Sequence, residues 1–229
     1  MLSWDWRRGG TSRALLSFAV LVLAASSLAV PVRAATPSAQ ALAKAVDAHY
    51  NHLTSLQTRF TERYRGMGMD RTESGTLTLR KPGRMRWAYD APAGKLFLLN
   101  GQDAISYTPG DPQADRLPAK QLDDLRSPLR FLLGHTQLAR ELDHLSAAPV
   151  ENNLYSLAGS PHGLSQRIRQ VTLVVDAGGI IHSLQIDEAD GAITTFTFSD
   201  GRENLPTPDS DFIFNPPPGV AIVNSVAPI

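Results

Sequence analysis

The residue types that most often carry out catalysis are scattered along this chain. Six histidines occur, and the closest pair, His49 and His52, is spaced for one face of a helix without the HExxH pattern of a metal site. We interpret this pair as part of an ordinary helix surface. Cysteine is absent, which excludes disulfides, thiolate nucleophiles and zinc–thiolate sites.

The sequence also contains no motif for nucleophilic catalysis, for acid–base catalysis by paired carboxylates or for phosphoryl transfer. No G-x-S-x-G turn occurs, and Gly159-Ser160-Pro161 is typical of a loop between strands. The adjacent carboxylates Asp123-Asp124 and Asp187-Glu188 would diverge in a helix or a strand, and no glycine-rich phosphate loop opens a helix. We therefore expect no enzyme activity, metal or cofactor. A hydrolase acting on lipid or cell-wall material is the alternative that a turnover screen would detect.

Residues 1–34 are typical of a secretory signal peptide. Arginines at positions 7, 8 and 13 precede the apolar stretch 14–25, and small residues stand at positions 32 and 34. The stretch is short for a membrane span, and Ala35 rather than cysteine follows the expected cleavage point, which excludes lipid attachment there. We expect general export, cleavage after Ala34, and a single soluble domain of residues 35–229 in the periplasm.

The charge balance argues against electrostatic partners. The whole chain has 22 basic and 22 acidic side chains, and residues 1–34 hold four of the arginines but one aspartate. The expected mature chain is therefore slightly acidic and has no basic patch for nucleic acid or for an anionic membrane surface. We expect neither partner.

The first element expected after the signal peptide is a short helix. Thr36 and Pro37 form an N-cap followed by proline at the first helical position. Apolar residues then recur at helical spacing over residues 38–53. This helix has one apolar face, so it can lie across a sheet.

From residue 55 onward the apolar period changes to two, which predicts antiparallel hairpins. Met85, Trp87 and Tyr89 should point to one face of their strand, and Arg84 and Arg86 to the other. Further strands are predicted over residues 96–99, 105–107, 154–157, 168–175, 180–187, 193–199, 212–214 and 220–223.

The middle of the chain departs from this rhythm. Helical spacing over residues 122–142 predicts an inserted helical segment, which contains a helix-compatible Pro128 and a C-capping Gly134. Glycines at positions 178 and 179 predict a tight hairpin over residues 176–179. Together these elements predict a mainly β, α+β fold: one long antiparallel sheet of ten or eleven strands with a few short helices. Such a sheet curls, and its apolar face encloses either a packed core or a lipid-sized cavity.

Whether the interior is a packed core or a cavity depends on what the large apolar side chains do. Composition alone does not distinguish the two. In one interpretation these residues fill an ordinary core, and in the other they line a cavity. They are Met85, Trp87, Leu96, Phe131, Leu132, Phe196 and Phe198.

Five motifs, taken together, resemble the outer-membrane lipoprotein carrier family, LolA. The strand motif is Lys81-Pro82-Gly83-Arg84-Met85-Arg86-Trp87; Ser55-Leu56-Gln57 with Phe60 precedes it, and Leu96-Phe97 with Tyr107 follows it. The central segment reads Pro128-Leu129-Arg130-Phe131-Leu132-Leu133-Gly134, and residues 212–220 match Phe-x-Phe-x-x-Pro-x-Gly-Val with an extra proline. Each motif is weak alone, but their order after a signal peptide is specific.

The resemblance implies a curved, unclosed antiparallel β-barrel with a lid of short α-helices over an apolar ligand cavity. A basic residue before the proline of the strand motif, here Lys81, would donate to lid carbonyls and hold the empty carrier closed; family members with arginine there present a planar fork, whereas lysine presents a flexible point charge. The matching lid segment is residues 131–134. The cavity and lid residues so implied are Lys81, Met85, Trp87, Leu96, Phe131, Leu132, Leu133, Phe196 and Phe198.

The resemblance also implies a function and partners. The protein would be a monomeric chaperone that shuttles the acyl chains of lipoproteins from the inner to the outer membrane. Its partners would be an inner-membrane ABC-type lipoprotein-releasing complex and an outer-membrane lipoprotein receptor. The alternatives are a carrier of another lipid, such as a glycolipid, and a lipid-sensing periplasmic regulatory domain.

Overall fold

The computed structural model describes residues 36–121 and 137–225, all within one compact unit, Ala35–Ile229. The expected lid residues Phe131, Leu132 and Leu133 lie outside the described residues. In chain order the elements are α1 (Ala39–His52), β1 (Ser55–Gly66), β2 (Met69–Arg80), β3 (Arg84–Ala91), β4 (Ala93–Asn100), β5 (Asp103–Tyr107), β6 (Gln113–Pro118), the 3₁₀ helix η1 (Ala119–Gln121), α2 (Leu138–Glu141), β7 (Leu142–Pro149), β8 (Tyr155–Pro161), β9 (Ile168–Val175), β10 (Ile181–Glu188), β11 (Ile193–Glu203), the 3₁₀ helix η3 (Asp209–Phe212) and β12 (Ala221–Asn224).

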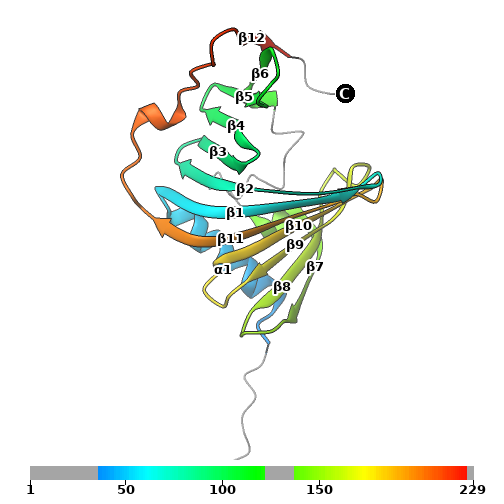
Figure 1. Ribbon diagram of the computed structural model, residues 1–229. Helices are drawn as coiled ribbons and strands as arrows, with labels where there is room; N and C mark the ends of the chain where they lie inside the picture. Colours follow the sequence, from blue (N-terminus) through cyan, green and yellow to red (C-terminus); the bar gives the residue numbers. More distant parts are fainter. Residues whose placement is uncertain (1–35, 122–136, 226–229) are drawn as a thin grey trace, which may run out of the picture. The chain divides into compact units, whose positions relative to one another are not determined.

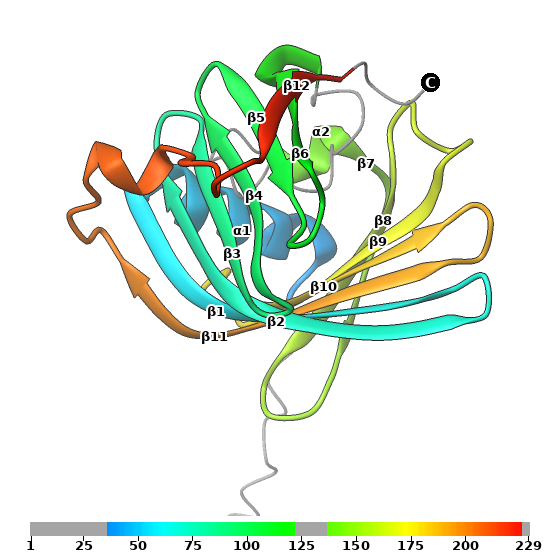
Figure 2. The same ribbon diagram turned by 45° about the horizontal axis from the view of Figure 1, so that its top comes forward.

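One sheet contains the twelve strands of the described chain, in the order β12-β6-β5-β4-β3-β2-β1-β11-β10-β9-β8-β7. Its two halves join where β1 pairs with β11, a strand far away in the sequence. The order begins with β12 and ends with β7, and Figures 1 and 2 show the open sheet curving with α1 on its inner side. The predicted mainly β fold, with an unclosed curved sheet and few helices, is confirmed.

Several details of the predicted sheet are wrong. The expected strand over residues 212–214 is replaced by η3, because the three prolines that follow it, at positions 216–218, cannot donate to a strand ladder. Most of the helical segment expected over residues 122–142 lies outside the described residues; its described part is α2, which ends at Glu141, and β7 begins at Leu142. In addition, β12 pairs with β6 in parallel, so the sheet is not wholly antiparallel.

Helix α1 forms as expected and covers the inner face of the sheet. Its N-cap is Ser38 rather than Thr36, since the Ser38 hydroxyl accepts a hydrogen bond from the Ala41 backbone N–H at 3.1 Å. Leu42, Val46 and Tyr50 recur every fourth residue and are buried in the main core, which also contains the inward side chains of the sheet. We call the sheet face that carries α1 the concave face.

Strand β4 is buried on both of its faces, which explains why its apolar run does not alternate with polar residues. Phe97 and Leu99 point to the concave face and belong to the main core. Leu96 and Leu98 point the opposite way and pack with Phe212 in a second cluster on the convex face. The C-terminal part of the chain therefore supplies a second, smaller core.

Residues 207–224, which we call the C-terminal strap, are fastened to the convex face by arginines of β2 and β3. Arg80 donates to the Thr207 carbonyl at 2.5 Å and to the Asp209 carboxylate, which also accepts from Arg84 at 2.8 Å. Arg86 donates to a strap carbonyl at 3.3 Å. The prediction that Arg84 and Arg86 point away from Met85 and Trp87 is therefore confirmed.

The predicted hairpin over residues 176–179 joins β9 to β10 and packs directly against α1. Gly179 has a φ of +90°, and a Cβ placed there would lie 2.4 Å from the Ala45 carbonyl oxygen. Glycine is therefore needed at this position for two reasons, the left-handed backbone and the close approach of the helix. The close packing fixes where α1 lies on the concave face.

We predict that Gly179→Ala destabilises the protein by more than about 2 kcal/mol, because backbone strain of about 1 kcal/mol is added to a clash with α1. Gly191→Ala is the matched control, since Gly191 has a φ of +92° in the β10–β11 hairpin with open space around it. Urea unfolding of both variants measures the difference. Equal losses of stability would show that the α1 contact contributes nothing.

Candidate ligand-binding site

The concave face of β1–β3 changes from apolar to polar along the strands. Inward side chains that are cross-strand partners on β1, β2 and β3 form rows across the face. Successive rows begin at every second residue of β1. Starting from Leu56, the rows are Leu56/Leu79/Met85, Thr58/Leu77/Trp87, Phe60/Gly75/Tyr89 and Glu62/Glu73. The face therefore has an apolar end near the start of β1 and a charged end about 20 Å away.

An aromatic cluster occupies the middle of this face. The rings of Phe60 and Trp87 meet edge to face at 4.7 Å, and the Trp87 ring lies 5.2 Å from Phe196 and 6.5 Å from Phe198. Phe60 and Phe198 sit directly opposite each other on β1 and β11. Three of the residues expected to line the cavity, Trp87, Phe196 and Phe198, are thus brought together, with Phe60 as a fourth member.

Met85 lies in the fully apolar row and is buried, with 2% of its surface exposed. Its neighbours across the strands are Leu79 and Leu99, and its sulfur accepts the indole N–H of Trp87 at 2.8 Å. This contact sets the orientation of the indole, so Met85 helps to hold the Trp87 ring in its place in the aromatic cluster.

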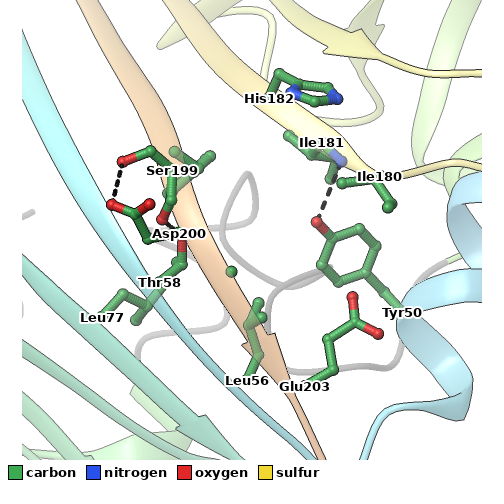
Figure 3. Close-up of a pocket in the computed structure, with 12 residues that line it drawn as sticks. Tyr50, Leu56, Thr58, Leu77, Ile180, Ile181, His182, Ser199, Asp200 and Glu203 are labelled. Atoms are coloured by element: carbon green, nitrogen blue, oxygen red, sulfur yellow. Dashed lines mark hydrogen bonds between the residues drawn. The ribbon is translucent and has the colours of Figure 1, made fainter.

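A first pocket of about 170 Å³ opens between α1 and the sheet. Figure 3 shows Tyr50 reaching from the helix toward Ile181, with Leu56, Thr58 and Leu77 on the neighbouring strands. Phe198 of the aromatic cluster also lines it. The lining is largely apolar, and its polar side chains include Asp200, Glu203 and His182.

A second pocket of about 310 Å³ lies on the other side of the aromatic cluster, near the charged end of the face. Its apolar lining includes Trp87, Phe97 and Phe196, and its polar lining includes Glu62 and Lys95. Phe198 of the aromatic cluster lines the first pocket, and Trp87 and Phe196 line the second.

Tyr50 ties the last turn of α1 to β10. Its phenol oxygen accepts the buried Ile181 backbone N–H at 3.2 Å. Burial raises the pKa of the Tyr50 phenol to about 12, with smaller contributions from the negative charges of Glu203 and Asp176. The phenol is therefore neutral at physiological pH, as a group inside an apolar pocket should be.

Lys81 lies at the turn between β2 and β3 and also holds α1. Its ammonium group donates to the Tyr50 backbone carbonyl in the last turn of the helix, which also accepts the Leu53 backbone N–H at 3.4 Å. Partial burial lowers the pKa of Lys81. The segment expected to receive this contact, residues 131–134, lies outside the described residues.

The remaining expected residue, Leu96, is separated from the aromatic cluster. Its side chain packs with the convex cluster, although it also borders the second pocket. The sequence interpretation missed several residues that shape the site, because their proximity depends on strand register. These residues are Tyr50, Phe60, Glu62, Glu73, Tyr89 and Lys95.

The histidines are dispersed in the fold as they are in the sequence. His49 is paired with Glu203 of β11 at 2.9 Å, so it is part of the attachment of α1 rather than a free helix surface as expected. His162 lies 3.0 Å from Asp143. Within residues 36–121 and 137–225, no group of three His, Cys, Asp or Glu residues could hold a metal ion. No helix in these ranges is both long and apolar enough to cross a membrane.

The chain is similar to known proteins over most of its length. Residues 51–215 match the model of the family described as "Outer membrane lipoprotein carrier protein LolA". The outer-membrane lipoprotein carrier protein of Chromobacterium violaceum is 27% identical over 199 residues, which cover 87% of this chain and 95% of that protein. The protein of the same name from Nitrosomonas europaea is 25% identical over 208 residues, or 89% and 96% of the two chains.

The fold also occurs among solved structures. An uncharacterized conserved protein from Thermus thermophilus superposes with a TM-score of 0.53 at 10% sequence identity, covering 82% of this chain and 99% of its own. At this identity the likeness concerns the arrangement of helices and strands alone.

We predict that Tyr50→Phe lowers the free energy of unfolding by about 1–3 kcal/mol at neutral pH, because a buried N–H loses its acceptor. The phenol pKa is raised in the folded state, so its contribution to stability is complete below pH 10 and is lost as the pH rises to about 12. The stability difference between wild type and variant should therefore narrow between pH 10 and about 12 in denaturant titrations. A difference that stays constant over this window would contradict the assignment.

Proposed function

Because the chain belongs to the LolA family of outer membrane lipoprotein carriers, we propose that it binds the acyl chains of lipoproteins between α1 and the concave face. One observation supports this most directly. Pockets of about 170 and 310 Å³ flank an aromatic cluster on the face that α1 covers. The concave face thus has open hollows beside its buried rings, and in this proposal the hydrocarbon chains enter from them.

The pockets are small for the proposed cargo, which supports a closed, empty state of the carrier. Ligand pockets of proteins typically measure about 300–1,000 Å³, and a lipid anchor with several chains needs the upper part of that range. The cargo therefore enters when α1 and the aromatic side chains move. The gain is large: each buried methylene contributes about 0.8 kcal/mol, so an anchor is worth on the order of tens of kcal/mol relative to water.

Helix α1 is suited to act as a movable cover. Polar contacts to separate parts of the fold hold it: Lys81 at the β2–β3 turn, Ile181 on β10 through Tyr50, and Glu203 on β11 through His49. A further contact joins Asp47 to the Leu138 backbone N–H at 3.1 Å. Each is a single interaction of modest strength. In this proposal the cover opens by breaking these contacts and by lifting Leu42, Val46 and Tyr50 from the main core, while the strands of the sheet stay paired.

The proposal includes the route of the cargo. Residues 1–34 would direct export and be removed, and residues 35–229 would act in the periplasm as a monomer. An inner-membrane ABC-type complex would load the carrier, and an outer-membrane receptor would accept the cargo. Phe131, Leu132 and Leu133 would form part of the lid. We expect no catalytic turnover, because the work of the protein is to bind and release.

We predict that Lys81→Leu leaves the fold intact and accepts lipoprotein but passes it on about tenfold less efficiently. Without the Lys81 contact, the closed state loses a charge-assisted hydrogen bond of about 1.5–3 kcal/mol, so the loaded, open state is favoured. Lys81→Arg should transfer normally, because it keeps a donor at the same place. The measurement is delivery of a labelled lipoprotein from the loaded carrier to outer-membrane vesicles.

Lys120→Leu is the control for this test, since Lys120 is an exposed lysine of η1. Circular dichroism and thermal unfolding establish that all variants are folded. Normal transfer by Lys81→Leu would refute the role of Lys81 in closing the carrier. Failure of the wild type to retain any lipoprotein would refute the proposed function itself.

A further inference from the structure

The charged end of the concave face holds two carboxylates that stand directly opposite each other. Glu62 on β1 and Glu73 on β2 are cross-strand partners, an arrangement that is unfavourable unless positive charges compensate it. Glu73 is moreover buried, with 6% of its side chain exposed. Carboxylates in this position need specific partners to remain in the fold.

Positive and polar groups provide these partners. Lys95 of β4 donates to Glu73, whose other carboxylate oxygen lies 3.2 Å from Nε of Arg71. The Tyr89 hydroxyl donates to Glu62 at 2.9 Å. The ammonium group of Lys95 also lies 4.4 Å from the centre of the Tyr89 ring, in the geometry of a cation–π contact. Two negative and two positive side chains therefore form one compact, balanced network.

This network forms one wall of the second pocket. Glu62, Tyr89 and Lys95 line that pocket together with Ser106 and Thr108, while Trp87 and Phe196 supply its apolar side. A lysine ammonium has three donors, and the Glu73 carboxylate and the Tyr89 ring engage two of them here. The pocket thus offers a third ammonium donor and two hydroxyls beside an aromatic surface.

We infer that the second pocket binds the uncharged ester or amide carbonyls of an acylated ligand, at the point where its hydrocarbon chains meet its polar group. This inference rests on the proposed function and states how the cargo is oriented. The carbonyls accept hydrogen bonds from Lys95 and the hydroxyls of Ser106 and Thr108. The chains run over the aromatic cluster toward the apolar row at Leu56.

The balanced charges of this network determine which polar group of a ligand fits the second pocket. A phosphate or a free carboxylate would lie close to Glu62 and Glu73 with no surplus positive charge to offset it. A cationic group would displace Lys95 from Glu73 and leave an ammonium without its carboxylate. A carbonyl oxygen accepts a hydrogen bond and brings no charge, so it fits this network better than either ion.

Two ligands that differ in carbonyls alone test the inference: dioctanoylglycerol, with ester links, and its dioctyl ether counterpart. Binding to the full chain is measured by displacement of a fluorescent alkyl probe. We expect the ester to bind about tenfold more tightly than the ether, as one to two hydrogen bonds to a charged donor would give. Dioctanoylphosphatidic acid should bind less tightly than dioctanoylglycerol.

Substitutions in the charged network test whether Lys95 causes the preference for the ester over the ether. Lys95→Met should reduce the preference for the ester to within about twofold while the ether binds as before. Because Lys95→Met leaves Glu73 buried with less compensation, the double variant Glu73→Gln/Lys95→Met is a second test that keeps the charges balanced. Lys44→Met, at an exposed position of α1, is the control and should keep the wild-type preference.

The outcomes separate this inference from the proposed function. Equal binding of ester and ether by the wild type would overturn the carbonyl site but leave an apolar carrier. Tighter binding of the phosphatidic acid would overturn it as well, since the site would then select an anion. A preference that survives in both Lys95 variants would show that other groups create it. Binding of neither ligand would refute the inference together with the function on which it rests.

Discussion

A mismatch in size between helix and sheet is the constraint on which the rest of this structure depends. Twelve strands spaced by about 4.8 Å span roughly 50 Å, whereas the 14 residues of α1 form a helix about 21 Å long. Among the described residues, α1 is the one helix of more than a single turn on the concave face. In the described part of the chain, α1 therefore covers only part of that face, and hollows lie beside the aromatic cluster.

The two faces of the sheet differ in role: the convex face is fastened by the C-terminal strap, and the concave face carries the proposed binding site. On the convex face, Arg80 and Arg84 clamp Asp209 of the C-terminal strap, and Phe212 completes a separate apolar cluster. On the concave face, the buried apolar side chains of α1 and a few single polar contacts hold the helix beside the aromatic cluster. A carrier needs this asymmetry, because it must release what it binds.

The parts of the structure set by local pattern were predictable from the sequence. Alternation placed Met85 and Trp87 inside and Arg84 and Arg86 outside, and Gly179 marked its hairpin. The pairing of Glu62 with Glu73 could not be foreseen, because it depends on the register between β1 and β2. Leu96 was assigned to the cavity, yet its side chain packs on the convex face, because the strap buries the side of β4 that a one-sided sheet would expose. The spacing of apolar residues along one strand does not show that a distant part of the chain packs over its other side.

The central claim is that hydrocarbon chains enter between α1 and the aromatic cluster, and Trp87 reports on this directly. The other tryptophans of the chain, Trp4 and Trp6, lie in residues 1–34, so Trp87 is the single indole of the expected mature chain 35–229. A triacylated lipopeptide with brominated chains should then quench Trp87 fluorescence, whereas the same lipopeptide without bromine should bind without quenching. Binding of the brominated lipopeptide with undiminished Trp87 emission would place the chains elsewhere and contradict the account.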